Sequence, residues 1–279
     1  MWAGPDEPEV RPLGLTLLSR CMAQTSQREE PTWGKLEPGT LDRIVVVSPH
    51  FDDAALGAAH LLLTYPGSTV ITVLGGWPPA FPEEPTAWDA AGGFKAGDDV
   101  VALRRQEDVA AMEVLGATPV WLSFPDHQYL TRAERPRPED VAPDLEAAIM
   151  EAQPTAVFLP MGIANPDHVL THDAGCQVRE HHRQMAWFAY EDHGYKHLPG
   201  LLAWRVARLF RSGLWPTPAI VPIEVDADRK RKAIWCYASQ IPPLEQEHAL
   251  TARLDANVPE QYWRLAPPPH GWERLMENV

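Results

Sequence analysis

Short apolar runs alternate with amphipathic segments between residues 43 and 190. The first two runs are rich in β-branched residues, and all of the runs are five or six residues long, which is typical of strands buried on both faces of a parallel sheet. The segments between them carry apolar residues at helical spacing, and glycines follow two of them, as expected at helix ends. The pattern predicts strands at 43–48, 69–74, 119–123, 155–159 and 186–190, and helices at 52–64, 100–115, 140–152 and 171–182.

This alternation indicates βαβ crossovers, so we predict an α/β fold: a Rossmann-like, three-layer αβα arrangement with a mostly parallel sheet. After residue 190 the pattern changes to two predicted strands, 206–210 and 220–225, followed by a helix at 228–239 and a short helical tail after Gly271.

The domain organisation follows from where this pattern begins and changes. We expect one domain over residues 41–279, with a Rossmann-like core at 41–190 and an elaborated C-terminal part at 191–279. Residues 1–40 are Pro-rich and weakly periodic, so we predict an N-terminal extension there.

The stretch 75–99 is dense in glycine, proline and aromatic residues. A structureless connection of this length inside a compact domain is usually functional. Its aromatic side chains suit stacking on a sugar ring or an apolar acyl group, and plain packing is the alternative. These side chains are Trp77, Phe81, Trp88 and Phe94.

Charge and composition exclude several kinds of partner. The chain has 24 Lys and Arg against 38 Asp and Glu, and a net charge of −14 repels phosphate backbones, so we expect no nucleic-acid partner. No apolar run approaches the ~20 residues that span a bilayer, and no secretory signal is evident, so we expect a cytoplasmic protein without a membrane partner. Cys21, Cys176 and Cys236 are too scattered for a disulfide framework, and we expect reduced thiols.

Chemically capable residues follow the first predicted strand. His50, Asp52 and Asp53 stand at its carboxyl end, where open parallel sheets bind ligands. Catalytic zinc takes His and carboxylate ligands and keeps a position for a water whose pKa falls to about 7. An Asp at a helix N-terminus is also an ordinary cap, so these residues alone fit both interpretations. No glycine-rich phosphate loop follows this strand, which disfavours nucleotide binding.

A third donor favours the metal interpretation. The predicted strand 155–159 ends in a polar loop that contains His168, at the carboxyl end of another strand of the sheet. His50, Asp53 and His168 would then form a His2Asp zinc site.

Two motifs in these loops resemble a known family. The run V-V-V-S-P-H-F-D-D-A-A-L-G at 45–57 resembles the opening P-H-x-D-D motif of the LmbE-like, or PIG-L, family of zinc-dependent de-N-acetylases. N-P-D-H-V-L-T-H-D-A at 165–174 is similar to that family's second motif, and shorter pieces at 104–116, 190–192 and 232–240 fit in the same order. The resemblance covers about residues 43–240, most of the chain.

The resemblance implies roles for the matching residues. His50, Asp53 and His168 would bind Zn2+, and Asp52 would be the general base that takes a proton from the attacking water. The substrate would be a small N-acylated molecule, with an N-acetylglucosamine conjugate as the default. The implied activity is a zinc-dependent hydrolase that removes an N-acyl group, by default acetyl, from an amino-sugar conjugate or a natural-product intermediate.

Asn165 departs from the family pattern. The second motif of the family usually begins with a histidine, interpreted as the general acid or as a partner of the oxyanion. An amide donates a hydrogen bond but cannot protonate a leaving amine. Asp52 could return the proton that it took, or His127 or His172 could act instead, the latter lying four residues after His168. A catalytically weak or inactive metal-binding relative that serves as a ligand-binding protein is the alternative function.

Other residues are expected on the substrate side: Arg104, Asp126, His127 and Trp88. For Arg104 the alternative is a surface ion pair with Glu107, three residues later on a predicted helix. For Asp126 the alternative is a turn residue. Homo-oligomer formation stays open.

Overall fold

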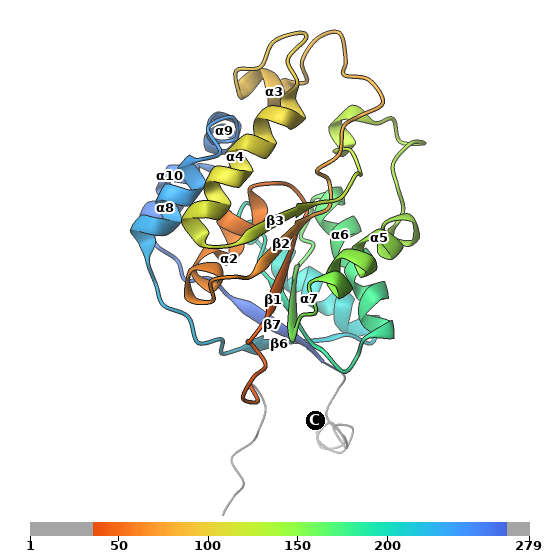
Figure 1. Cartoon of the computed structure of the whole chain (residues 1–279), viewed down its shortest axis with the longest axis vertical. Coiled ribbons are helices and arrows are strands. Elements are labelled where there is room, and N and C mark those ends of the chain that lie inside the picture. The colour runs from red at the N-terminus through yellow and green to blue at the C-terminus, as the bar shows by residue number, and fades with distance from the viewer. Residues whose placement is uncertain (1–35, 267–279) are drawn as a thin grey trace, which may run out of the picture. The chain divides into compact units, whose positions relative to one another are not determined.

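The computed structural model describes residues 36–266. Cys21, the helical tail predicted after Gly271 and all but the last five residues of the predicted extension 1–40 lie outside this range. Within it, seven strands form one sheet in the order β3-β2-β1-β4-β5-β7-β6 (Figure 1). The strands are β1 (Ile44–Ser48), β2 (Thr69–Thr72), β3 (Thr118–Trp121), β4 (Ala156–Pro160), β5 (Ala186–Tyr190), β6 (Trp215–Ala219) and β7 (Tyr262–Ala266).

The first five strands are all parallel, in the spatial order β3-β2-β1-β4-β5. β7 runs antiparallel between β5 and β6, so it extends the sheet with a mixed edge. This arrangement confirms the predicted α/β class with a mostly parallel sheet.

Helices cover both faces of the sheet (Figure 1). Val46 and Phe158 face one layer of apolar side chains, and Val45, Val47 and Leu159 face the other. β1 is therefore buried at all five positions, which explains its unbroken apolar sequence. The first layer contains α2 (Asp53–Thr64), α4 (Val100–Leu115) and α8 (Ala227–Trp235), and the second contains α5 (Pro138–Glu151), α6 (Pro166–His181) and α7 (Leu201–Arg211).

Shorter elements lie in the connections. The long stretch 75–99 contains α3 (Ala87–Ala91), and a 3-10 turn, η1 (His127–Tyr129), follows β3. α9 (Ile241–His248) and α10 (Leu250–Asp255) precede β7. No helix between residues 36 and 266 combines the length and the apolar character needed to cross a membrane. Cys176 and Cys236 are free thiols.

The prediction of a strand at 206–210 is wrong, because these residues belong to α7. The inner side of that helix carries the buried Arg205 and Leu209, while Trp204 and Phe210 are exposed. Arg205 donates from Nε to the carbonyl of Met161. Over the whole of 201–211 the arginines recur every third residue among apolar residues, which is helical spacing, and the short run 206–210 was too narrow to show it.

The strand predicted at 220–225 is also wrong. The chain there has no regular structure, and the strand is β6, which ends just before it at Ala219. β6 is an edge strand that carries Pro216 and Pro218, residues that an edge tolerates and a central strand does not.

Candidate active site

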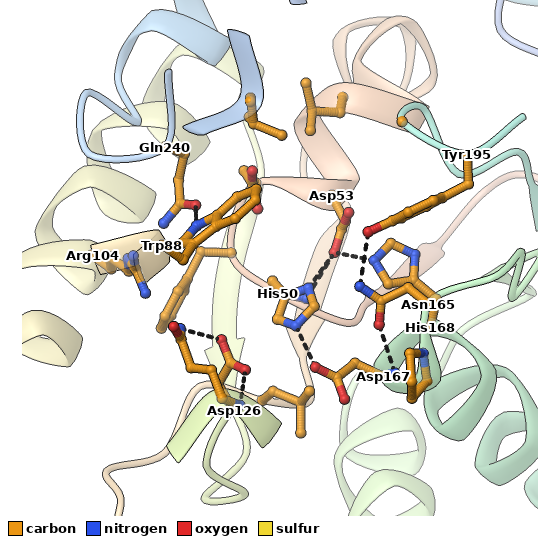
Figure 2. A pocket seen from close by; sticks show the side chains of 18 of the residues that line it. His50, Asp53, Trp88, Arg104, Asp126, Asn165, Asp167, His168, Tyr195 and Gln240 are labelled. Carbon is orange, nitrogen blue, oxygen red and sulfur yellow. Dashed lines mark hydrogen bonds and ion pairs between the residues drawn. The ribbon is translucent and has the colours of Figure 1, made fainter. Parts of the chain in front are cut away.

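A cavity of about 300 Å³ opens at the carboxyl ends of the parallel strands (Figure 2). Its walls come from the segments after all five parallel strands, together with α3, α4 and α9. The lining includes His50, Asp52, Asp53, Leu56, Trp88, Val101, Arg104, Asp126, Gln128, Tyr129, Asn165, Asp167, His168, Tyr195, Gln240, Leu244 and His248.

His50, Asp53 and His168 meet in this cavity, as the sequence predicted. Asp53 Oδ2 lies 3.1 Å from His50 Nδ1 and 3.4 Å from His168 Nε2. One donor atom from each residue lies within 4.8 Å of the other two. Two imidazole nitrogens and a carboxylate at this separation match the protein ligands of a catalytic zinc site.

The second nitrogen of each histidine is held by a carboxylate. His50 Nε2 lies 3.0 Å from Asp167 Oδ2, and His168 Nδ1 lies 2.6 Å from Asp192 Oδ1. Such carboxylates accept the ring N–H and leave the lone pair of the other nitrogen for a metal. Both histidines are thus oriented as ligands before any ion binds, and the residues present fit zinc.

The electrostatics also favour bound positive charge. Burial by itself lowers the pKa of His50, but hydrogen bonds with Asp167 and Asp53 raise it well above 6.5. For His168 burial again acts downward, and Asp53 and Asp192 raise the pKa above the ordinary value. The carboxylates therefore stabilise a cation at this position, be it a proton or a metal ion.

A further group of donors shares His50. One atom each from His50, Asp126 and Asp167 also lies within 4.8 Å of the others. In this group Asp167 is held by two histidines, because its Oδ1 forms an ion pair with His127 Nδ1. Burial would raise the pKa of Asp167, but His127 and His50 lower it below its usual range.

Asp52 stands at the N-cap of α2, yet its side chain makes no cap hydrogen bond. Ser48 Oγ accepts instead from the backbone N–H of Ala54. The Asp52 carboxylate is thus left to face the cavity, and burial together with the neighbouring Asp53 raises its pKa to about 7. The capping alternative does not hold for Asp52.

Asn165 is the N-cap of α6, which begins at Pro166, five residues earlier than predicted. Its Oδ1 accepts from the backbone N–H of Asp167 at 2.8 Å. Its Nδ2 donates to the hydroxyl of Tyr195 at 2.9 Å. The amide therefore faces the cavity with both of its ends engaged.

His172 does not reach the cavity, which corrects the expectation that it acts there. Its ring is fully buried one turn below His168, with Nδ1 2.7 Å from the carbonyl of Pro160 and Nε2 3.3 Å from Cys176 Sγ. Burial and the nearby Arg205 lower its pKa to about 4. His172 therefore packs α6 against the sheet.

His127 also stands behind the cavity wall. It contacts a lining residue through its ion pair with Asp167, and it is itself absent from the lining. Its Nε2 is buried without a hydrogen-bond partner in the described part of the chain. The structure thus gives His127 an indirect position, away from the substrate side where the sequence placed it.

Arg104 lines the cavity and is buried. Its Nη2 pairs with Asp89 Oδ1 at 2.8 Å, while Glu107 instead accepts from the backbone and hydroxyl of Ser239. The alternative of a surface pair between Arg104 and Glu107 is therefore wrong.

Trp88 on α3 lines the cavity and donates from Nε1 to Gln240 Oε1 at 2.8 Å. The other aromatic residues of the long stretch pack elsewhere: Trp77 on Arg105, Phe81 on Tyr129 and Phe94 beneath Arg104. Asp126 lines the cavity and also stabilises a turn, because both of its oxygens accept from Gln128.

Sequence reasoning assigned no role to two residues of this site, Asp167 and Tyr195, and placed Asp192 only within the piece 190–192 of the family pattern. Asp167 lies inside the second motif, and Asp192 follows β5 at the same edge of the sheet as the two histidines. The rule that ligands bind at the carboxyl ends of parallel strands was the signal for Asp192. Nothing in the local sequence signalled Tyr195, which lies on an irregular loop.

Comparison with known proteins agrees with the fold and the motifs. Residues 45–179 match the family model of PIG-L, GlcNAc-PI de-N-acetylase. The crystal structure of A40926 pseudoaglycone deacetylase Dbv21 is 27% identical, covers 80% of this chain and 96% of its own, and has a TM-score of 0.66. A triple mutant of the deacetylase Orf2 of the teicoplanin biosynthetic pathway is 26% identical, covers 82% and 100%, and has a TM-score of 0.65.

A zinc-inhibited form of teicoplanin deacetylase Orf2 shares the fold at 24% identity and a TM-score of 0.65, over 82% of this chain and 100% of its own. No curated protein sequence matches the chain. The family model spans the segment that contains His50, Asp53 and His168, and the structural matches extend over the C-terminal part. Residues 45–179 therefore carry a PIG-L family domain, and the chain resembles deacetylases of known structure over most of its length.

Proposed function

We propose that the chain is a zinc-dependent deacetylase that removes an acetyl group from the nitrogen of a small amino-sugar conjugate of the kind made in natural-product biosynthesis. The observation that carries the proposal is the convergence of His50, Asp53 and His168, with each histidine held by its own carboxylate, beside the uncapped Asp52. Catalytic zinc sites use this donor set and this outer support.

A zinc ion held by these three residues would supply a Lewis acid for the acyl carbonyl and would make water a stronger nucleophile near neutral pH. The remaining chemistry belongs to the chain. Asp52 takes a proton as water attacks the carbonyl carbon, and a carboxyl group with a pKa near 7 suits this transfer. When the C–N bond breaks, Asp52 returns the proton to the departing nitrogen, which yields acetate and an amine.

The cavity wall bears on the substrate class. Leu56, Val101, Leu244 and Trp88 contribute apolar surface to the cavity, while Asp126, Gln128 and Arg104 offer polar groups. Mixed walls of this kind fit a sugar ring joined to an apolar group. The relatives at 26–27% identity are described as deacetylases of A40926 pseudoaglycone and of the teicoplanin pathway, which supports a glycosylated natural product.

The test measures metal and activity together. The full chain is purified without chelator, its zinc content is determined, and acetate release is followed on N-acetylglucosamine, its glycosides with apolar aglycones, and N-acetylated glycopeptides. We expect one zinc per chain, loss of activity with chelation, and recovery on titration to one equivalent. The titration continues beyond that point, because one relative is described in a zinc-inhibited form.

A chain that holds no stoichiometric zinc and whose activity ignores chelation would contradict the proposal. A chain that binds zinc but releases no acetate from any substrate would instead support the ligand-binding alternative. Asp52→Asn is the matched control, since it keeps the shape of the side chain and removes the base.

A further inference from the structure

Tyr195 is clamped over the metal-ligand cluster. Its ring packs edge-on against His168, with centroids 5.4 Å apart, and against His248 at 5.1 Å. The preceding residue is glycine for a physical reason, because a Cβ at Gly194 would lie 3.0 Å from His248 Nε2. Figure 2 shows the hydroxyl of Tyr195 directed toward Asp53 and His168. The loop after β5 thus fixes a phenol beside the predicted metal ligands.

The hydrogen bonds of Asn165 determine which way the Tyr195 hydroxyl is polarised. Asn165 Oδ1 is occupied by the N–H of Asp167, so the group that meets Tyr195 must be Nδ2, a donor. The Tyr195 oxygen is therefore an acceptor in this contact, and its own hydrogen remains to be donated. Within residues 36–266 the Tyr195 hydroxyl donates to no acceptor of the protein. The hydroxyl faces the cavity.

Two other phenols near the site donate their hydrogens to groups of the protein. Tyr129 lines the cavity but donates to Asp89 Oδ2 at 2.8 Å. Tyr190 donates to the carbonyl of Val47 at 3.0 Å. Tyr195 differs from both, because its hydroxyl accepts from Asn165 and donates to no group of the protein among the described residues.

From this arrangement we propose that Tyr195 is a catalytic residue whose O–H donates a hydrogen bond to the acyl oxygen as that oxygen becomes negative, and that Asn165 is the residue that positions it. The inference rests on the proposed deacetylase function. A preorganised donor aimed at a developing oxyanion contributes on the order of 100-fold or more to kcat. The pair thereby explains how the site works with an amide at position 165. Asn165 orients the Tyr195 hydroxyl, and that hydroxyl donates to the oxyanion.

The first test is Tyr195→Phe, which keeps the ring packed between His168 and His248 and removes the hydroxyl. We expect unchanged zinc content, a KM within about threefold, and a kcat lower by on the order of 100-fold. A readout apart from activity is the affinity for a methylphosphonamidate analogue of the acetamide, whose tetrahedral anionic oxygens mimic the oxyanion. By calorimetry this affinity should fall by a similar factor, while that for the amine product stays constant.

Tyr65→Phe is the matched control. The Tyr65 hydroxyl donates to the carbonyl of Pro222, and Tyr65 does not line the cavity. It should leave kcat and analogue affinity within about twofold of the parent. If Tyr195→Phe also changes neither quantity by more than about threefold, the role of Tyr195 is refuted while the deacetylase function stands. A zinc-loaded parent that releases no acetate and binds no analogue would refute the proposed function and this inference with it.

The second test separates the two roles of Asn165, which caps α6 and donates a hydrogen bond to Tyr195. Serine is also a good N-cap, so Asn165→Ser keeps the start of α6 and removes the donor to Tyr195. We expect a smaller loss of kcat than in Tyr195→Phe, and a double variant no worse than Tyr195→Phe to within about twofold. If the factors by which the two single substitutions lower kcat multiply in the double variant, the claim that Asn165 acts through Tyr195 is contradicted.

Discussion

Asp192 is the residue whose replacement tests the metal site most directly. Its Oδ1 accepts from His168 Nδ1 at 2.6 Å, and its Oδ2 accepts from the backbone N–H of Ile163 at 2.9 Å. Asn has the same shape but only one accepting oxygen. In Asp192→Asn the amide NH2 must therefore face either the N–H of Ile163 or the ring of His168.

Both outcomes disturb the ligand. If the NH2 faces Ile163, two donors oppose each other in a buried place, at a cost of about 1–3 kcal/mol. If it faces His168, the ring hydrogen moves to Nε2, and the lone pair that would bind zinc is lost. Mutation of such supporting carboxylates lowers metal affinity about 10- to 100-fold, which corresponds to roughly 1.4–2.7 kcal/mol. We expect Asp192→Asn to fall in this range.

The assay is competition for zinc with a chromophoric chelator at pH 7, with the thermal unfolding midpoint of the metal-free protein recorded alongside. Asp173→Asn is the matched control: it lies on α6 like His168, but its carboxylate is partly exposed and pairs with Arg205. We expect its zinc affinity to equal that of the parent. A folded Asp192→Asn protein that binds zinc within twofold of the parent would refute the argument that Asp192 sets the tautomer of His168.

Three further perturbations follow from the structure. Asp52→Asn should keep its zinc and lose roughly 10²- to 10⁴-fold in kcat, and retained turnover in an acetate-release assay would exclude Asp52 as the base. Burial raises the pKa of Asp108 from 3.8 to about 6, so the stability due to its proton is present at low pH and is lost as pH rises through 6. The free energy of unfolding of Asp108→Asn, measured relative to the parent by denaturant unfolding, should therefore increase by about 2 kcal/mol from pH 4.5 to pH 8. A difference between variant and parent that does not change with pH would contradict the raised pKa of Asp108. Gly57→Ala should lower the free energy of unfolding by about 1–3 kcal/mol, because its Cβ would lie 2.6 Å from the Tyr190 ring, and an unchanged unfolding midpoint would show that the ring yields freely.

Four of the five parallel strands, all but the edge strand β3, were predictable because they are buried on both faces. Strands of this kind show as unbroken β-branched runs, and the helices between them show a clear period, as at 100–115, where the predicted bounds match α4. The C-terminal part was not predictable in the same way. β6 is an edge strand with two prolines, and β7 pairs antiparallel with β5 from far along the chain. In each case the decisive contact is tertiary and leaves no local period.

The residues of the site also differ in whether local sequence features or tertiary contacts determine their position. His50, Asp52 and Asp53 were visible because a strand, a tight turn and a helix start are local features, and His168 because it follows another strand. His172 was misjudged because helical spacing places it on the same face as His168 but cannot show which turn is level with the cavity. Its ring instead meets the carbonyl of Pro160.

Sheet order explains why these residues have to be considered together. β1, β4 and β5 are neighbours in the sheet although their loops lie more than a hundred residues apart at the extremes. Each adjacent pair of loops is joined by a polar contact: His50 to Asp167 between the first two, and His168 to Asp192 between the second two. Asn165 and Tyr195 form one more link of this kind, so the consequence of an amide at 165 is decided by a loop after β5 that no motif marks. A change in any one loop should therefore be compensated in the adjacent loop, and substitutions at 165 and 195 should depend on one another more than either depends on Asp52.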